Sequence, residues 1–231
     1  MPKVVDHDER REALARAVWS VVARAGVEGA TVRAVAAEAG WSMGALRYYF
    51  ATQDGLLTFA LEAMLRRVPQ RLARHLAAAE KPAAERRAAE KPAADERGAE
   101  LAQRLLEELL PLDSERLGEV LVWLAFLARA RVDAGLAALR LTGWAGERFV
   151  CRYAVAAVSG CPPPERPDDP LPTAALEAHA ESLHIFVDGL TLQGATFPEQ
   201  VPPAQQRRLL RERLAELRSD LPGGEETWTR P

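Results

Sequence analysis

The stretch TVRAVAAEAGWSMGALRYYFATQ, residues 31–53, has the pattern of two short helices joined by a tight corner. Thr31 is a good N-cap for the first helix, and Gly40 is suited to end it. Ser42 can cap a second helix, MGALRYY, after a corner of only three residues. A helix, a glycine-containing corner and a short second helix predict a helix-turn-helix unit.

Apolar residues recur at helical spacing on both sides of this stretch, and no segment alternates convincingly as a strand would. The face from Leu14 to Ala25 predicts a first helix that Gly26 ends. Thr52 is placed to cap a long helix. The further helices are expected at about 53–79, 101–109, 117–127, 134–158, 173–196 and 202–218. The sequence therefore predicts an all-α fold, with a three-helix unit followed by a larger helical domain.

Two polar segments interrupt this pattern. Residues 80–89, EKPAAERRAA, are followed by a near copy, EKPAADERGA, at 90–99. This tandem repeat has no apolar face, so we expect a solvated linker or a broken helix and assign it no function. The proline-rich segment 159–172 predicts an exposed loop.

Composition limits the classes of function. The chain has 231 residues and a formal net charge of -3, so no basic surface covers the whole protein. Residues 1–60 hold seven basic and seven acidic side chains, and DNA binding would require a local arrangement of charge. We expect Cys151 to be buried and Cys161 to lie in a loop, where a thiol sensor is a weak alternative. The polar N-terminus and the absence of a membrane-length apolar run favour a soluble, cytoplasmic protein.

The second short helix has residues suited to the major groove of DNA. Leu46 and Phe50 are four residues apart and can anchor one face on the preceding helix. Met43, Arg47 and Tyr48 then point outward. Arg47 can make a bidentate contact with guanine or hold a phosphate.

Two further features of this helix favour DNA. Gly44 has no side chain and permits a close approach, while the hydroxyls of Tyr48 and Tyr49 can donate to phosphates. The competing interpretation is that the rings are core residues and that Arg33, on the preceding helix, is a solvated charge. The complete arrangement of caps, corner and outward polar groups favours the DNA interpretation.

Residues 31–57 resemble the DNA-binding signature of TetR-type transcriptional regulators, and the likeness extends over about residues 10–60. The matching positions are Thr31, Ala36, Gly40, Ser42, Gly44, Leu46, Tyr49, Phe50, Leu56 and Leu57. The form LRYYF, with PLDSER, WLAFLARA and VDGLTLQG further on, is similar to the branch that contains the choline-responsive regulator BetI.

The resemblance implies a homodimer that binds a pseudo-palindromic operator in double-stranded DNA and is released by a small-molecule effector. It implies a DNA-binding domain over 1–52, a ligand-binding and dimerisation domain over 53–218 and a flexible tail over 219–231. The family commonly has lysine at position 53, so Gln53 is expected to weaken one phosphate contact. The expected DNA-contacting residues are Thr31, Arg33, Trp41, Ser42, Met43, Gly44, Arg47, Tyr48, Tyr49, Thr52 and Gln53.

Two groups of apolar residues are candidates for the second domain. Trp123 and Phe126 are the strongest candidates for an effector pocket, because their faces could take a cationic or flat aromatic ligand. The full pocket set is Phe59, Met64, Trp123, Phe126, Trp144, Phe149 and Tyr153, each of which could equally be core. The stripe expected at the dimer interface, which could also pack within its own domain, is Leu176, Ala180, Leu183, Val187, Leu190 and Gly194.

Other classes of function have less support. The sequence has no nucleophile elbow, no phosphate-cradling loop and no paired carboxylates in an apolar setting, so we expect neither an enzyme nor a cofactor. Glu181, His184 and Asp188 share a helix face, but a solvated polar stripe is favoured over a metal site. The alternative to a repressor is a dimeric helical adaptor or co-regulator with weakened DNA binding, favoured by the neutral charge of residues 1–60 and by Gln53.

Overall fold

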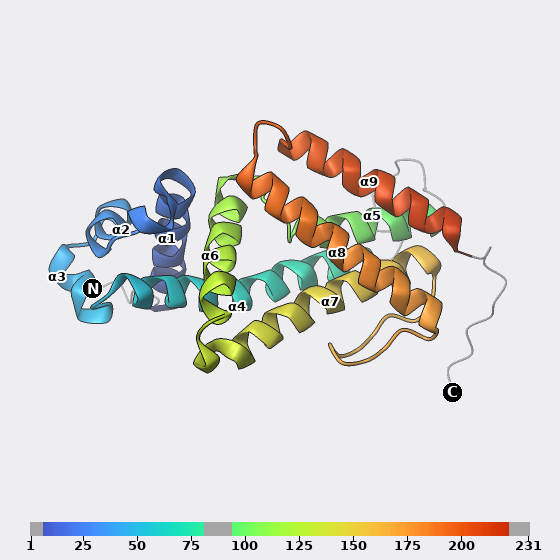
Figure 1. Cartoon of the computed structure of the whole chain (residues 1–231), viewed down its shortest axis with the longest axis horizontal. Coiled ribbons are helices and arrows are strands. Elements are labelled where there is room, and N and C mark those ends of the chain that lie inside the picture. The colour runs from blue at the N-terminus through green and yellow to red at the C-terminus, as the bar shows by residue number, and fades with distance from the viewer. Residues whose placement is uncertain (1–6, 81–93, 222–231) are drawn as a thin grey trace, which may run out of the picture. The chain divides into compact units, whose positions relative to one another are not determined.

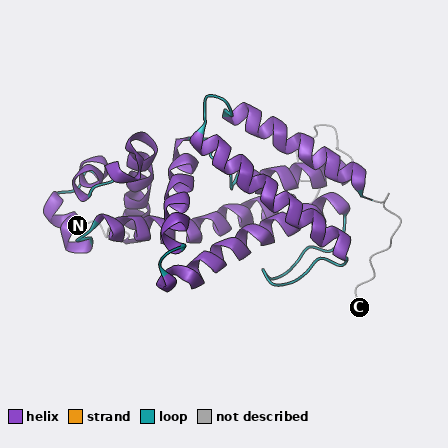
Figure 2. Ribbon diagram, in the orientation of Figure 1, coloured by secondary structure: helices purple, strands orange, loops and turns teal. Residues whose placement is uncertain are grey.

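The computed structural model describes residues 7–80 and 94–221, and within these ranges every regular element is a helix (Figures 1 and 2). This confirms the all-α prediction for the described chain. The first three helices are α1 (His7–Gly29), α2 (Val32–Ala39) and α3 (Met43–Tyr49). The others are α4 (Gln53–Glu80), α5 (Ala94–Glu107), α6 (Ser114–Ala130), the 3₁₀ turn η1 (Ala134–Leu136), α7 (Ala137–Ser159), α8 (Ala174–Thr196) and α9 (Pro203–Asp220).

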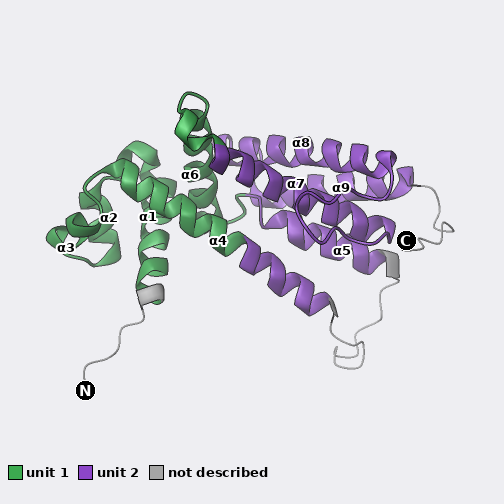
Figure 3. Cartoon of the chain, turned by 90° about the horizontal axis from the view of Figure 1, so that it is seen from below, with its two compact units in different colours: residues 1–68, 111–137 green, residues 69–110, 138–231 purple. Residues whose placement is uncertain are grey.

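The chain divides into two compact units (Figure 3). Unit 1 comprises residues 1–68 and 111–137, and unit 2 comprises residues 69–110 and 138–231. Unit 1 therefore extends well beyond the boundary expected at residue 52, because it includes the first part of α4 and all of α6. Helix α4 runs through the boundary, and its internal proline, Pro69, lies at that point.

The core of unit 1 forms where α6 packs on α1. Trp19 and Val22 of α1 are almost fully buried. Gly118 of α6 lies against the backbone of Trp19, where a β-carbon would collide with the Trp19 carbonyl oxygen. The absence of a side chain at residue 118 therefore permits the close packing of the two helices. Gly26 has a φ of 73°, a left-handed conformation that suits glycine, and it interrupts α1 where the sequence predicts the end of the first helix.

Unit 2 buries both apolar and charged residues. Leu183 of α8 and Leu210 of α9 are fully buried. Glu108, directly after α5, is also buried, and its carboxylate pairs with Arg71 Nε at 2.6 Å and with His75 Nε2 at 2.8 Å. These two partners come from α4, so the carboxylate links the second half of α4 to the end of α5. A buried carboxylate of this kind would be costly without its partners.

Most of the tandem repeat lies outside the described residues. Its last part differs from the linker expectation, because residues from Ala94 onward form α5. The proline-rich segment after Ser159 is a loop, as predicted. No helix in the described ranges combines the length and the apolar character needed to cross a membrane.

Both cysteines are buried, and they are unpaired. Cys151 lies inside unit 2 as expected, whereas Cys161 is in the predicted loop but only 5% exposed. Burial raises the pKa of each thiol. Buried thiols with a raised pKa are poor nucleophiles, which disfavours the thiol-sensor alternative.

Candidate DNA interface and ligand-binding unit

Side-chain caps fix the beginnings of α2 and α3. The Thr31 hydroxyl accepts a hydrogen bond from the Ala34 amide at 3.2 Å, and the Ser42 hydroxyl accepts one from the Ala45 amide at 3.1 Å. Both predicted N-caps are therefore confirmed. A hydroxyl that accepts a backbone hydrogen bond still has its own O–H, which remains able to donate to a phosphate.

The corner between α2 and α3 depends on Gly40. Its φ is 67°, in the left-handed region that other residues rarely adopt. The Trp41 amide donates to the Ala36 carbonyl at 2.9 Å, and the Gly40 amide donates to the Ala37 carbonyl at 3.3 Å. This pattern is a Schellman-type ending, which satisfies the last carbonyls of α2 and turns the chain into α3.

One face of α3 holds the helix in unit 1. Leu46 is fully buried, as its anchoring role requires. Phe50, at the C-terminal cap, packs its ring against Phe59 of α4 with the ring centroids 5.1 Å apart. The predicted division of α3 into an anchored face and an outward face is correct. The exposed residues of α3 are Met43, Gly44, Ala45, Arg47, Tyr48 and Tyr49.

The outward rings form a row at the end of α3. Tyr48 is 85% exposed and Tyr49 is 61% exposed. Their rings meet edge to face at 5.3 Å, and Trp41 meets Tyr49 in the same way at 5.9 Å. Edge contacts of this kind restrain the rings while leaving the hydroxyls in solvent. The hydroxyls are therefore free to donate to phosphates.

The charged side chains of α2 and α3 differ in whether they have an ion-pair partner. Glu38 accepts hydrogen bonds from Ser20 at 2.7 Å and Arg24 at 3.0 Å, and these bonds lower the pKa of its carboxyl. Arg33 and Arg47 are exposed, and neither forms an ion pair with another residue in the described ranges. Two uncompensated guanidinium groups therefore remain on α2 and α3.

Gln53 is the first residue of α4, and its side chain bonds to the backbone of α1. Its side-chain amide donates to the Val27 carbonyl at 2.5 Å and to the Glu28 carbonyl at 3.3 Å. These carbonyls belong to the end of α1, so Gln53 ties the start of α4 to the end of α1. The weakened phosphate contact expected at this position stays a prediction. Thr52 caps α4 as predicted, through a bond from the Gly55 amide at 3.1 Å.

Four of the seven expected pocket residues lie in unit 1. Trp123 and Phe126 stack with their ring centroids 5.4 Å apart and their planes 22° apart. Phe59 is buried between the Phe50 ring and the guanidinium of Arg11, which lies 5.0 Å from the Phe59 centroid. Phe59 therefore packs in the core that supports α3. The fourth residue, Met64, is also buried.

The other three belong to unit 2. Phe149 and Tyr153 meet edge to face at 6.2 Å. Trp144 is 50% exposed on α7, and its ring lies 5.7 Å from that of His184. The seven residues are divided between the two units, so a single pocket formed by all of them stays a prediction.

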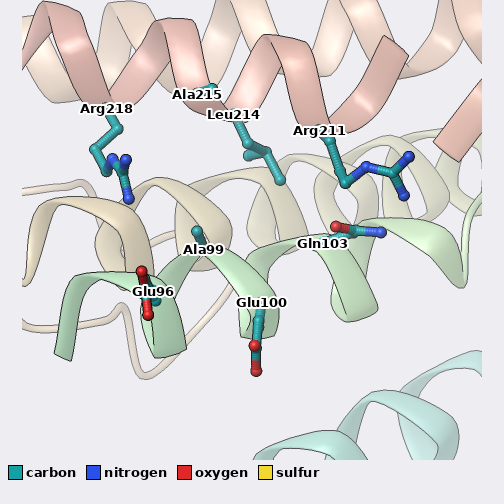
Figure 4. Close-up of a pocket in the computed structure, with 8 residues that line it drawn as sticks. All are labelled: Glu96, Ala99, Glu100, Gln103, Arg211, Leu214, Ala215 and Arg218. Atoms are coloured by element: carbon teal, nitrogen blue, oxygen red, sulfur yellow. The ribbon is translucent and has the colours of Figure 1, made fainter. Parts of the chain in front are cut away.

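A groove that the sequence did not indicate lies between α5 and α9 (Figure 4). Part of its α5 wall lies in the tandem repeat at residues 80–99, for which the sequence predicted a solvated linker or a broken helix. Its lining residues are Glu96, Ala99, Glu100, Gln103, Arg211, Leu214, Ala215 and Arg218.

The stripe expected at the dimer interface is in the core of unit 2. All six members are buried, because α8 turns this face toward its own unit. They are therefore unavailable to a second chain, and the assignment of these residues is wrong. The buried residues are Leu176, Ala180, Leu183, Val187, Leu190 and Gly194. The large apolar residues exposed on α7 and α8 are Leu141, Trp144, Ile185 and Leu192.

Comparison with known proteins agrees with this arrangement of elements. Residues 14–58 match the model of the bacterial regulatory proteins of the tetR family, and residues 98–219 match the C-terminal domain of BetI-type transcriptional repressors. The chain is 32% identical to the HTH-type transcriptional regulator PksA of Bacillus subtilis, over 94% of each protein.

Solved structures show the same fold. A transcriptional regulator from Rhodococcus sp. Rha1 is 29% identical, with a TM-score of 0.62 over 90% of this chain and 95% of the other. The multidrug binding protein EbrR, complexed with imidazole, is 27% identical, with a TM-score of 0.51 over 90% of this chain and 94% of the other.

Proposed function

We propose that this chain, which belongs to the TetR family of bacterial regulatory proteins, is a homodimeric repressor that a small-molecule effector releases from its operator. Membership of the family makes it a DNA-binding transcriptional regulator. The observation that carries the proposed DNA contact is the outward row of Arg47, Tyr48 and Tyr49 on a short helix capped at both ends.

Different residues of α3 are proposed to contact different parts of the DNA. Arg47 can read a guanine through two parallel hydrogen bonds or hold a phosphate. The hydroxyls of Tyr48 and Tyr49 donate to phosphates and so fix the register of the helix on the duplex. Gly44 has open space where a β-carbon would lie, which allows the helix backbone to approach DNA closely.

A homodimer follows from the form of the operator. A pseudo-palindromic site needs two recognition helices in successive major grooves, about 34–36 Å apart. The exposed apolar side chains Ile185 and Leu192 are seven residues apart on one face of α8, and Leu141 and Trp144 lie on α7. Large apolar side chains exposed on neighbouring turns favour an interface. We propose this surface, in place of the buried stripe, as the contact between copies.

The effector is proposed to be a cationic or flat aromatic compound. The stacked pair of Trp123 and Phe126 supports this class, because aromatic faces attract cations and stack on planar rings. The complex of the related EbrR with imidazole supports a small-molecule effector in general. The test is a melting-temperature screen with quaternary amines and aromatic compounds. If no compound shifts the melting temperature, the effector class is wrong.

The adaptor alternative rests on Gln53 and on the neutral charge of residues 1–60. The Gln53 amide is bonded to the α1 backbone and residue 53 carries no positive charge, so this support remains. The Arg24–Glu38 pair removes one charge of each sign and leaves the count neutral. The repressor is favoured because Arg33 and Arg47 are exposed on α2 and α3.

Substitution of Arg47 tests how the operator is read. We expect Arg47→Ala to weaken binding by about 1–3 kcal/mol and to relax the preference at one base position. Fluorescence anisotropy with a set of single-base operator variants measures both effects. Arg208→Ala, an exposed arginine of α9 in unit 2, serves as the control and should bind as the wild type does. A uniform loss across the variants would make Arg47 a phosphate contact instead.

A further inference from the structure

Three potential metal ligands meet between α7 and α8. Glu147 comes from α7, and His184 and Asp188 come from successive turns of α8. The His184 Nε2 atom lies 3.4 Å from Glu147 Oε2 and 3.7 Å from Asp188 Oδ1. The three ligand atoms all lie within 4.8 Å of one another.

These distances fit a shared ion. In a tetrahedral site with bonds of about 2.0–2.2 Å, neighbouring ligand atoms lie about 3.3–3.6 Å apart. The His184–Glu147 distance lies in this range, and the His184–Asp188 distance is slightly longer. The two carboxylate oxygens lie within 4.8 Å of each other and would close on the ion as it binds. Both His184 distances are long for direct hydrogen bonds, which have their optimum at about 2.8–3.0 Å.

The His184 side chain is buried, whereas the Asp188 side chain is exposed. The His184 side chain is only 3% exposed, so surrounding groups hold it and direct Nε2 at the carboxylates. The Asp188 side chain is 56% exposed in the single chain, and it lies between Ile185 and Leu192 on the face of α8 proposed as the contact between copies. An ion could therefore enter from solvent in the single chain, and in the proposed dimer it would lie at that contact.

The charges around the cluster favour a cation. Arg148 lies 3.7 Å from the Glu181 carboxylate and over the Trp144 ring, 5.3 Å from the centroid. Glu181 therefore has a cationic partner, while the carboxylates of Glu147 and Asp188 lie beside the His184 imidazole. The field of Arg148 also reaches Asp188 and limits the affinity of the site.

We propose that Glu147, His184 and Asp188 bind one divalent transition-metal ion, with water completing its coordination. An imidazole nitrogen with two carboxylates suits Zn²⁺ and neighbouring transition metals, whereas Mg²⁺ and Ca²⁺ prefer all-oxygen sites. This revises the expectation for α8. The ligand that joins His184 and Asp188 is Glu147 from another helix, and Glu181 pairs elsewhere.

Isothermal titration of the full-length, metal-free protein with Zn²⁺ tests the site. We expect one ion bound for each chain and no comparable binding of Mg²⁺. Asp188→Asn and Glu147→Gln should each weaken Zn²⁺ binding at least tenfold. His179→Gln changes a histidine of the same helix outside the cluster and should leave binding unchanged.

The titration measures Zn²⁺ binding and needs no operator DNA. A failure of the metal site is therefore distinguishable from a failure of the proposed DNA binding. Asp188 is more than half exposed, and its substitution should leave the fold intact, as far-UV circular dichroism checks. The site is refuted if the wild type fails to bind Zn²⁺. It is equally refuted if Asp188→Asn and Glu147→Gln bind as the wild type does, or if only His179→Gln loses binding.

Discussion

At the scale of single residues, a substitution of Gly44 should have opposite effects on the stability of α3 and on its affinity for DNA. Nothing lies within 4 Å of the position that a β-carbon would occupy. Gly44→Ala should therefore stabilise the free protein by about 0.5–1 kcal/mol, because alanine favours helix. The added methyl group should nevertheless weaken DNA binding. Thermal melts and anisotropy titrations measure the two effects, and unchanged affinity would show that α3 does not approach DNA through this residue.

Gln53 is the second residue with a distinct role. Its amide donates to two carbonyls at the end of α1, so Gln53→Ala should reduce the free energy of unfolding by about 0.5–1.5 kcal/mol. Gln53→Glu should cost more, because a carboxylate would then face the same two carbonyl oxygens. Urea denaturation measures both.

The salt dependence of DNA binding separates this role from a phosphate contact. Glutamine carries no charge and releases no counterion in either role, so Gln53→Ala should leave the salt slope unchanged. Gln53→Lys is the informative comparison. A slope steeper by about one unit in the lysine variant would place residue 53 against DNA after all.

At the scale of helices, the contact between α1 and α6 depends on Gly118. A β-carbon at this position would collide with the Trp19 carbonyl oxygen, and backbone cannot move aside cheaply. We expect Gly118→Ala to destabilise the protein by about 1–3 kcal/mol. Gly146→Ala, at a helical position with open space, should instead be neutral or stabilising. Equal effects of the two substitutions in urea denaturation would contradict the close packing.

The local features of the helices could be predicted from sequence, whereas their partners could not. Thr31, Gly40 and Ser42 determine caps and a corner through bonds to residues a few positions away, and these predictions were correct. The inclusion of α6 in unit 1 depends on Gly118 meeting Trp19, which are 99 positions apart and share no local pattern.

In the candidate sites, too, the sequence predicted local patterns but not the partners from other helices. The periodicity of α8 correctly marked an apolar stripe that includes Leu183, but periodicity does not say which surface covers it. The residues 181, 184 and 188 were interpreted as a polar stripe, because Glu147, the third member of the proposed metal cluster, lies on α7, 37 residues before His184. Gln53 was assigned to DNA by analogy, while its actual partners come from the end of α1.

At the scale of the whole molecule, the account requires two chains for each operator. Ile185→Glu combined with Leu192→Glu should convert the dimer to a monomer, because a charged side chain is costly to bury without a partner. Light scattering after size exclusion measures the mass, and operator affinity should fall with it. Gln193→Glu, an exposed change of the same charge on α8, should remain dimeric. A double variant that stays dimeric would place the interface elsewhere.

The central claim is that the helix-turn-helix of this chain recognises specific DNA. The most direct measurement is an anisotropy titration of the purified protein with the DNA upstream of its own gene, at several salt concentrations and beside a scrambled duplex. We predict tight binding to the upstream DNA alone, with an affinity that falls steeply as salt rises. No binding at low salt, or equal affinity for the scrambled duplex, would contradict the account.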